Sequence, residues 1–182
     1  MRTVHALPLA AAILLAACGG DADTDGDGNV STEEAVAEAA GAVKPQPGEY
    51  RASYELLEFD VPGMPDAVKQ QMQAQMGGAA EMAQANTYCL TPEEAEANGV
   101  EEMAKSMAEG DCTVARFDVS GGTISAEMQC TGADGVDAKV TMDGQMTATS
   151  STMTMATEMD LQGQTVRTKA RVTSERIGDC AA

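Results

Sequence analysis

The stretch that decides the fold is CTVARFDVSGGTISAEMQC, residues 112–130. On both sides of Gly121-Gly122, apolar side chains alternate with polar ones, which is typical of two half-buried strands joined by a two-residue turn. Counting outward from that turn pairs apolar residues with one another: Val119 with Ile124, Phe117 with Ala126, and Ala115 with Met128. All of them then fall on one face, as a sheet with one buried side requires. The stretch therefore predicts an antiparallel β-hairpin.

The C-terminal part repeats this pattern around Gln162-Gly163. A turn there again pairs apolar residues: Met159 with Val166, Met155 with Ala170, and Met153 with Val172. On the opposite face Glu158 lies across from Arg167, which favours a cross-strand ion pair. A further strand is expected over residues 136–146, with a turn or bulge near 149–151, because the apolar parity shifts there.

Upstream of residue 112 the pattern changes between strand and helix. Residues 50–56 and 86–90 predict strands, and residues 65–83 carry Val68, Met72 and Met76 at helical spacing. Thr91-Pro92-Glu93-Glu94 is a capping box with Pro at the first helical position.

A second helical piece follows that box and places Val100, Met103 and Met107 on one side. The sequence thus predicts an α+β domain over residues 48–182. We expect a mostly antiparallel, curved β-meander that packs on one or two Met-lined helices.

The N-terminus predicts export and lipidation. Arg2 precedes an apolar run over residues 6–17 that is too short to span a bilayer as a permanent helix. It ends in Leu15-Ala16-Ala17-Cys18, which resembles a bacterial lipobox. We therefore expect residues 1–17 to be a lipoprotein signal peptide and Cys18 to carry the acyl anchor, palmitate included. The residue after the cysteine is Gly19 and not Asp, and the resemblance to enterobacterial lipoproteins then implies sorting to the periplasmic face of the outer membrane.

Residues 18–47 hold seven acidic residues and one lysine, and predict an acidic tether with almost nothing to bury. Within it, DTDGDGNVSTEE, residues 23–34, matches the EF-hand calcium loop. The expected oxygen ligands come from Asp23, Asp25, Asp27, Asn29, Ser31 and Glu34. No helix leads into this loop, and no second loop is present to pair with Val30. Ca²⁺ binding and a merely solvated acidic spacer therefore both stay open.

Four cysteines follow Cys18, and an even number in an exported domain predicts two disulfides. The hairpin register described above places Cys112 opposite residue 131, on the other face from Cys130, which disfavours a bond between these two. Of the remaining connectivities we favour Cys89–Cys112 with Cys130–Cys180, although sequence alone does not determine the pairing.

Charge excludes several classes of function. The chain has 11 basic and 29 acidic residues, for a net charge of −18, which disfavours binding to nucleic acid. The single histidine, His5, lies in the signal peptide, so histidine-based catalysis is excluded from the mature chain and no catalytic residue is predicted.

Two further features suggest a binding site, but a structural role explains each of them better. The spacing Met153-Thr154-Met155 suits a copper ligand pair, but the methionines fall on predicted core faces, which favours packing. The basic residues Arg167, Lys169, Arg171 and Arg176 alternate along the last strand, where neutralisation of neighbouring acids is favoured over docking of an anionic partner.

The order of Tyr88-Cys89-Leu90-Thr91, Gly121-Gly122 and Gly178-Asp179-Cys180 resembles the proteobacterial envelope family catalogued as domain of unknown function 3617. The resemblance covers about residues 47–181. It implies an exported, disulfide-bonded domain and no particular activity.

We expect a non-enzymatic, lipid-anchored envelope protein whose curved sheet binds a partner envelope protein or a small apolar ligand. The alternative is a calcium-responsive lipoprotein that uses the loop at residues 23–34. An open apolar pocket between sheet and helix would favour the first hypothesis.

Overall fold

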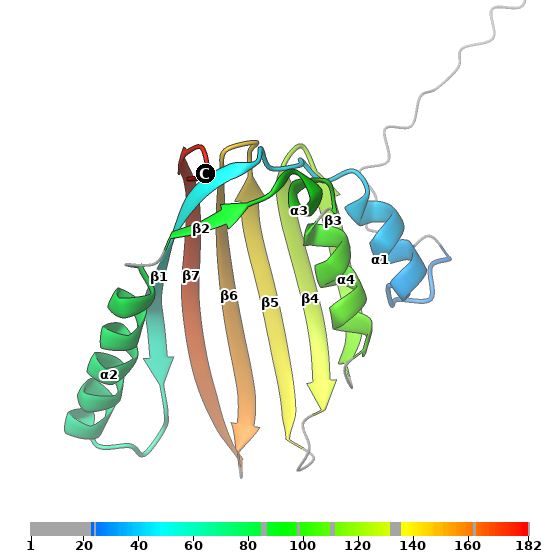
Figure 1. The fold of residues 1–182 in the computed structure, drawn as a ribbon. Coiled ribbons are helices and arrows are strands. Elements are labelled where there is room, and N and C mark those ends of the chain that lie inside the picture. Colours follow the sequence, from blue (N-terminus) through cyan, green and yellow to red (C-terminus); the bar gives the residue numbers. More distant parts are fainter. Residues whose placement is uncertain are drawn as a thin grey trace, which may run out of the picture.

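The computed structural model describes residues 23, 25–84, 87–97, 99–109, 112–131, 136–161 and 163–181. In this part of the chain, one antiparallel sheet has the strand order β2-β1-β7-β6-β5-β4-β3 (Figure 1). Its strands are β1 (Gly48–Asp60), β2 (Thr87–Leu90), β3 (Cys112–Ser120), β4 (Thr123–Thr131), β5 (Asp137–Met146), β6 (Ser150–Leu161) and β7 (Gln164–Gly178). Strands β3 to β7 form a consecutive meander, and β1 lies beside β7.

The helices are α1 (Thr32–Ala39), α2 (Asp66–Gln84), α3 (Pro92–Glu96) and α4 (Gly99–Glu109). The capping box expected at Thr91 is confirmed: the Thr91 hydroxyl accepts from the Glu94 N–H, and the Glu94 carboxylate accepts from the Thr91 N–H. The hydrogen bonds that the Glu94 carboxylate accepts from the Thr91 N–H and from the Thr91 hydroxyl, both 2.9 Å, hold the pKa of Glu94 below its ordinary value. None of the helices in the described residues is both long and apolar enough to cross a membrane.

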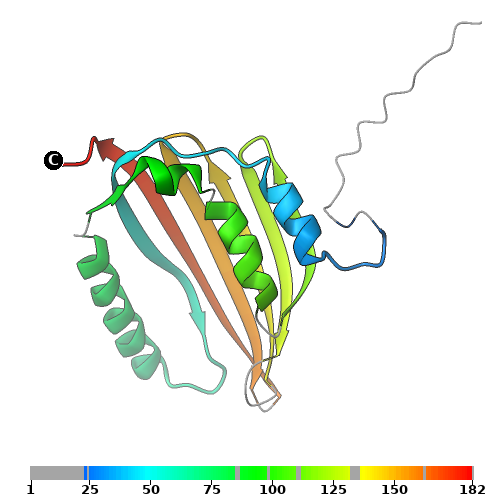
Figure 2. The ribbon, with the colours of Figure 1, turned by 45° about the vertical axis from the view of Figure 1, so that its right-hand side comes forward.

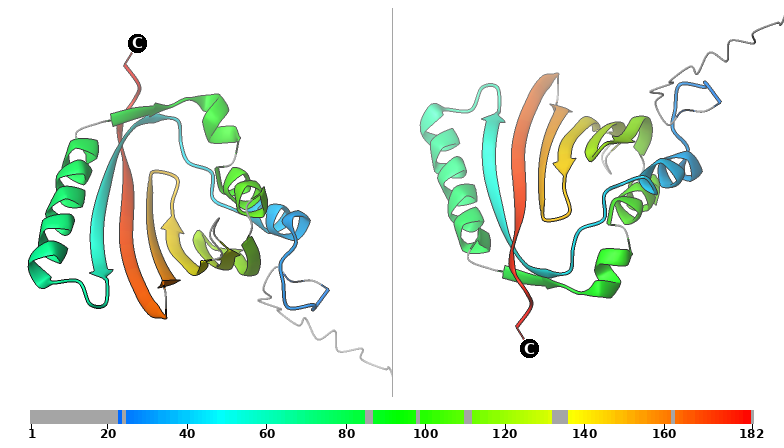
Figure 3. Two further views of the ribbon diagram at one scale, coloured as in Figure 1. Left: turned by 90° about the horizontal axis from the view of Figure 1, so that it is seen from below. Right: turned by 90° about the horizontal axis from the view of Figure 1, so that it is seen from above.

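The helices sit at opposite ends of the sheet. Helix α4, with α1 packed beside it, covers one face at the β3–β5 end (Figure 2). Helix α2 lies alongside β1 at the other end (Figure 3). Strand β2 pairs with β1 only at Gly48–Arg51, and the rest of β1, whose other edge pairs with β7, is flanked by α2.

The hydrophobic core lies under α1 and α4. Phe117 and Ile124 of the β3–β4 hairpin are its largest fully buried side chains, and Val100, Ala104 and Met107 of α4 pack in the same cluster. Met103 packs against this cluster while partly exposed. On α2, by contrast, Val68 and Met72 are exposed.

The register expected for the β6–β7 hairpin is confirmed. Met159 pairs with Val166, Met155 with Ala170, and Met153 with Val172. On the other face Arg167 Nε lies 2.9 Å from Glu158 Oε1. Arg171 reaches Glu55 of β1 at 3.1 Å, so two of the basic residues on β7 neutralise acids on neighbouring strands.

The predicted disulfide connectivity is wrong. The structure joins Cys112 to Cys130 and Cys89 to Cys180 in place of Cys89–Cys112 and Cys130–Cys180. The reason is a β-bulge at Ala115: the predicted pairs nearest the turn form, but Met128 pairs with Val114 in place of Ala115. Because one extra residue flips every later side chain to the other face, Cys112 comes directly opposite Cys130.

The expectation that residues 18–47 have almost nothing to bury fails from Val30 onward. Val30 is 6% exposed and Ala39 is 0% exposed, and both belong to the core cluster. Ala35 and Ala39 are four residues apart on α1, so they share one face, and their small side chains let α1 approach α4 closely. The signal peptide over residues 1–17 and Cys18 lie outside the described residues.

Candidate functional site

Strand pairing creates a continuous apolar row across the face that α4 partly covers. From β1 to β3 the row runs Leu56, Ala170, Met155, Met142, Ala126 and Phe117. In the opposite direction, from β3 to β6, the exposed fraction of these side chains rises sharply: it is 0% at Phe117, 6% at Met142 and 46% at Met155. The helices bury the β3–β5 half of the row and leave the half on β6, β7 and β1 open.

This open half forms an apolar groove of about 500 Å³. Ten residues from the sheet and α4 line it: Tyr54, Leu56, Met103, Met142, Met153, Met155, Thr157, Thr168, Ala170 and Val172. The volume lies in the range of about 300–1,000 Å³ that small-molecule pockets occupy. Four methionines line this groove, and their flexible thioether side chains adapt to ligands of irregular shape.

The groove changes in polarity along β6 and β7. Three successive cross-strand pairs form its floor: Met153 with Val172, Met155 with Ala170, and Thr157 with Thr168. One end is therefore apolar, and the other presents two hydroxyl groups. None of the described residues that line the groove carries a charge.

Toward the start of β1, on the far side of Tyr54 from Leu56, aromatic and polar contacts cover the same face of the sheet. Tyr50 is 3% exposed and stacks on Tyr88 with ring centroids 5.7 Å apart. The Tyr50 hydroxyl donates to the Gln46 carbonyl at 2.7 Å, and the Tyr88 and Ser174 hydroxyls lie 2.8 Å apart. Burial raises the pKa of Tyr50, and the nearby Arg176 charge opposes this shift.

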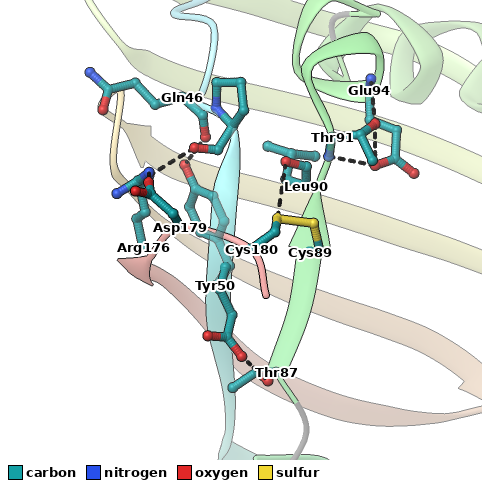
Figure 4. Close-up of a disulfide and its surroundings, with 12 residues drawn as sticks. Gln46, Tyr50, Thr87, Cys89, Leu90, Thr91, Glu94, Arg176, Asp179 and Cys180 are labelled. Carbon is teal, nitrogen blue, oxygen red and sulfur yellow. Dashed lines mark hydrogen bonds and ion pairs between the residues drawn. A yellow bond between two sulfur atoms is a disulfide. The ribbon is translucent and has the colours of Figure 1, made fainter. Parts of the chain in front are cut away.

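The Cys89–Cys180 disulfide fixes this closed end. It ties β2 to the segment after β7, next to Tyr50 and Arg176 (Figure 4). Arg176 donates to the Pro47 carbonyl at 2.9 Å and pairs with Asp179. The C-terminal segment and the start of β1 are therefore held together by covalent and polar contacts at one point.

The opposite face of the sheet is polar. It carries an open hollow of about 550 Å³ lined by threonines and other mostly polar groups: Thr123, Asp143, Gly144, Gln145, Thr152, Thr154, Arg171 and Thr173. Arg171, a basic residue of this lining, pairs with Glu55. Although this hollow is slightly larger, the apolar groove is the better candidate site, because a contiguous exposed apolar patch is the less usual feature of a folded protein.

The predicted calcium loop brings three of its expected ligands together. Carboxylate oxygens of Asp23, Asp25 and Asp27 lie within 4.8 Å of one another. The Asp23 carboxylate accepts from the Gly26 N–H at 2.7 Å and from the Gly28 N–H at 3.0 Å, and Gly28 has a φ of 88°. The loop is thus folded around these side chains.

The other expected ligands are placed differently. The Glu34 carboxylate caps α1 by accepting from the Ser31 N–H at 2.9 Å and from the Ser31 hydroxyl at 2.8 Å. Asn29 is exposed, and its N–H donates to Asp27. Val30 N–H donates to the Val114 carbonyl at 2.7 Å, so the edge strand β3 takes the position that a second loop occupies in paired EF-hands.

Sequence reasoning predicted the apolar floor of the groove but not the groove itself. The alternation of Met153, Met155, Ala170 and Val172 shows which face is apolar. Whether a helix covers that face depends on where α2 and α4 dock, and the methionines on both predicted helices gave no sign that α2 would lie at the sheet edge.

Fold and site together define a disulfide-bonded α+β domain with one half-covered apolar sheet face. The chain belongs to the family described as protein of unknown function (DUF3617), whose model matches residues 45–180. Neither the curated proteins nor the solved structures gave a significant match to the chain.

Proposed function

We propose that the protein is a non-enzymatic, lipid-anchored binding module of the bacterial envelope that holds a small apolar ligand in the groove between α4 and β1. The observation that carries this proposal is that two large apolar side chains in the groove floor are exposed. Met155 is 46% exposed and Val172 is 43% exposed, and none of the described lining residues is charged. Covering each large apolar side chain is worth about 1.5–3 kcal/mol when burial is complete. A ligand that fills the groove recovers part of that free energy.

Binding is tested with an uncharged apolar fluorophore whose emission rises in an apolar site. Met155→Glu places a charge in the floor, and we expect at least a tenfold loss of fluorophore affinity, because the carboxylate must be desolvated when the ligand binds. The matched control is Thr154→Glu, which adds the same charge one residue away on the opposite face. Equal affinities of the two variants and the unchanged protein would refute the groove as the site.

We also propose that Cys18 anchors the protein at the periplasmic face of the outer membrane. The support is the lipobox at residues 15–18, and a diacylated cysteine provides stable attachment without a membrane-spanning helix. Cells fed a clickable palmitate analogue should label the protein, and Cys18→Ala should abolish both the label and sedimentation with outer membranes. Labelling of the Cys18→Ala variant would contradict this anchor.

A second candidate function is a calcium response at residues 23–34. It is favoured by the convergence of the Asp23, Asp25 and Asp27 carboxylates and by the bond that joins Val30 to β3. Three carboxylates this close repel one another, and a divalent cation with oxygen ligands relieves that repulsion.

Titration calorimetry of the delipidated protein with CaCl₂ tests this function. We expect saturable heat at about millimolar affinity, as in extracellular calcium modules. Asp23→Ala should remove that heat, and Glu175→Ala, which removes an exposed acid elsewhere, should retain it. Equal heats from the Asp23→Ala variant and the unchanged protein would rule out the loop.

A further inference from the structure

The groove does not end at Met153. A second hollow of about 190 Å³ lies on the far side of this residue, and Met103 and Met153 line both spaces. The hollow is bounded mainly by apolar side chains of α4, of the sheet and of the segment that precedes β1, among them Val100, Ile124 and Val43. Two methionines therefore form the boundary between the groove and a second apolar hollow that is open to a similar degree.

Gly144 leaves room at this boundary. It pairs with Met153 on one side and Ile124 on the other, so it occupies the row between groove and hollow. A Cβ atom at this position would overlap the Met153 sulfur, which shows that the Met153 side chain lies across the glycine. Met153 is unbranched and has three rotatable side-chain bonds, so it can change rotamer without strain in the sheet.

The combined path is bent. The groove follows β6 and β7 from the Thr157–Thr168 pair to the Met153–Val172 pair, about 14 Å at the usual rise of a strand. The hollow then runs across the strands, because its lining passes from Met153 on β6 through Met146 on β5 to Ile124 on β4. A flexible chain follows such a corner, and a rigid fused-ring molecule does not.

The charges define the chemistry of the ligand. Among the described residues, none that lines the groove is charged at neutral pH, and the whole chain carries a net charge of −18, which repels anions. At the outer end, the Thr157 and Thr168 hydroxyls offer hydrogen bonds to a neutral polar group. This is complementary to an uncharged polar head with an apolar tail.

The size of the exposed patch argues against a second copy of the chain as the occupant. Of the described residues that line the groove, only Met155 and Val172 are exposed, and the others are half-buried or buried. A stable protein interface takes about 20–30 residues and buries about 800 Å² on each partner. A small molecule matches the patch, and a dimer interface does not.

We propose that the groove and this second hollow together bind one flexible acyl chain of an uncharged amphiphile, with Met153 as the residue that sets the accepted chain length. This inference rests on the proposed function and deepens it. The tail enters past Met103 and Met153 under α4, and the head stays at Thr157 and Thr168.

The test uses monoacylglycerols from octanoyl to palmitoyl, which displace the apolar fluorophore from the full-length, delipidated protein. We expect affinity to rise up to about fourfold for each added methylene until the path is full, and then to level off. Met153→Ala enlarges the passage and should move this plateau to longer chains. Met153→Phe narrows it and should move the plateau to shorter chains.

Thr152→Phe, on the opposite face next to Met153, is the matched control and should leave the plateau in place. If Met153→Phe does not fold, Met153→Ala still decides the question, because its predicted shift is in the opposite direction. An unchanged plateau in Met153→Ala, or equal binding of a rigid sterol, overturns the chain-length inference. Failure of the unchanged protein to bind any probe overturns the proposed function instead.

Discussion

Gly121 and Gly122 both adopt positive φ, 57° and 85°, in the two-residue turn between β3 and β4. Two positive φ angles in succession match the twist of the flanking strands, and glycine adopts them without a steric penalty. The surroundings of the two residues differ. A Cβ on Gly121 would meet nothing within 4 Å, whereas one on Gly122 would lie 2.5 Å from the Met146 carbonyl oxygen.

We therefore predict different costs for the same substitution at neighbouring positions. Gly121→Ala should lower the free energy of unfolding by about 1–2 kcal/mol, which is the usual penalty for a left-handed residue with a Cβ. Gly122→Ala should cost clearly more, because backbone must also move and the Met146 N–H bond to the Gly122 carbonyl, 2.6 Å long, is disturbed. Urea unfolding of both variants measures the difference. Equal destabilisation would show that the contact with Met146 is unimportant.

At this scale, sequence reasoning succeeded close to the turn and failed beyond Arg116. Alternation determines the pairs Val119–Ile124 and Phe117–Ala126, because apolar side chains on one face of the strand clearly alternate there with polar side chains on the other. Ala115 and Val114 are both apolar, so the pattern cannot show which one the bulge excludes from the core. The wrong disulfide connectivity followed from this single residue.

Among the elements, the two disulfides secure different parts of the sheet. Cys112–Cys130 joins adjacent strands of one hairpin, across 18 residues of sequence. Cys89–Cys180 joins β2 to the C-terminal segment, across 91 residues. The second bond therefore closes a loop that contains the whole meander, β3 to β7.

We predict that removal of Cys89–Cys180 is the more destabilising change. In the chain-entropy description, closing loops with sequence separations of 18 and 91 contributes about 3 and about 4–5 kcal/mol respectively. The paired substitutions Cys112→Ala with Cys130→Ala, and Cys89→Ala with Cys180→Ala, separate the two contributions in urea unfolding at equal protein concentration. A larger loss from the hairpin pair would show that native packing around Cys112 outweighs loop entropy.

For the helices, local sequence signals were sufficient to place the ends but not the docking faces. The capping box at Thr91 and Glu94 defines where α3 begins regardless of tertiary context. The exposure of Val68 and Met72 shows that an apolar stripe with helical spacing need not face the core.

At the scale of the whole molecule, the position of β1 controls the site. The chain from β3 to β7 is a meander that local turns specify, but β1 pairs with β7 across more than a hundred residues, and no nearby turn indicates that partner. By lying beside β7, β1 supplies Tyr54 and Leu56 as one wall of the groove, while α4 supplies Met103 as the other. The open apolar face is thus a property of long-range topology, which explains why the residues alone predicted its composition and not its existence.

The boundary of the domain follows from the same packing. The family model begins at residue 45, but the core cluster begins at Val30. Ala35 and Ala39 of α1 belong to that cluster along with Val100 and Ala104 of α4. We infer that residues 30–44 are an integral part of the folded domain, and that only the chain before Val30 can act as a tether.

This inference predicts opposite behaviour for two alanines of one helix. Ala39 is 0% exposed, whereas Ala37 is exposed on the other side of α1. Ala39→Glu should lower the free energy of unfolding by about 3–5 kcal/mol, because it forces an unpaired charge into the core. Ala37→Glu should stay within about 0.5 kcal/mol of the unchanged protein, as surface substitutions do. Urea unfolding gives both values. If the two variants were equally stable, α1 would be part of the tether, and the domain would begin where the family model does.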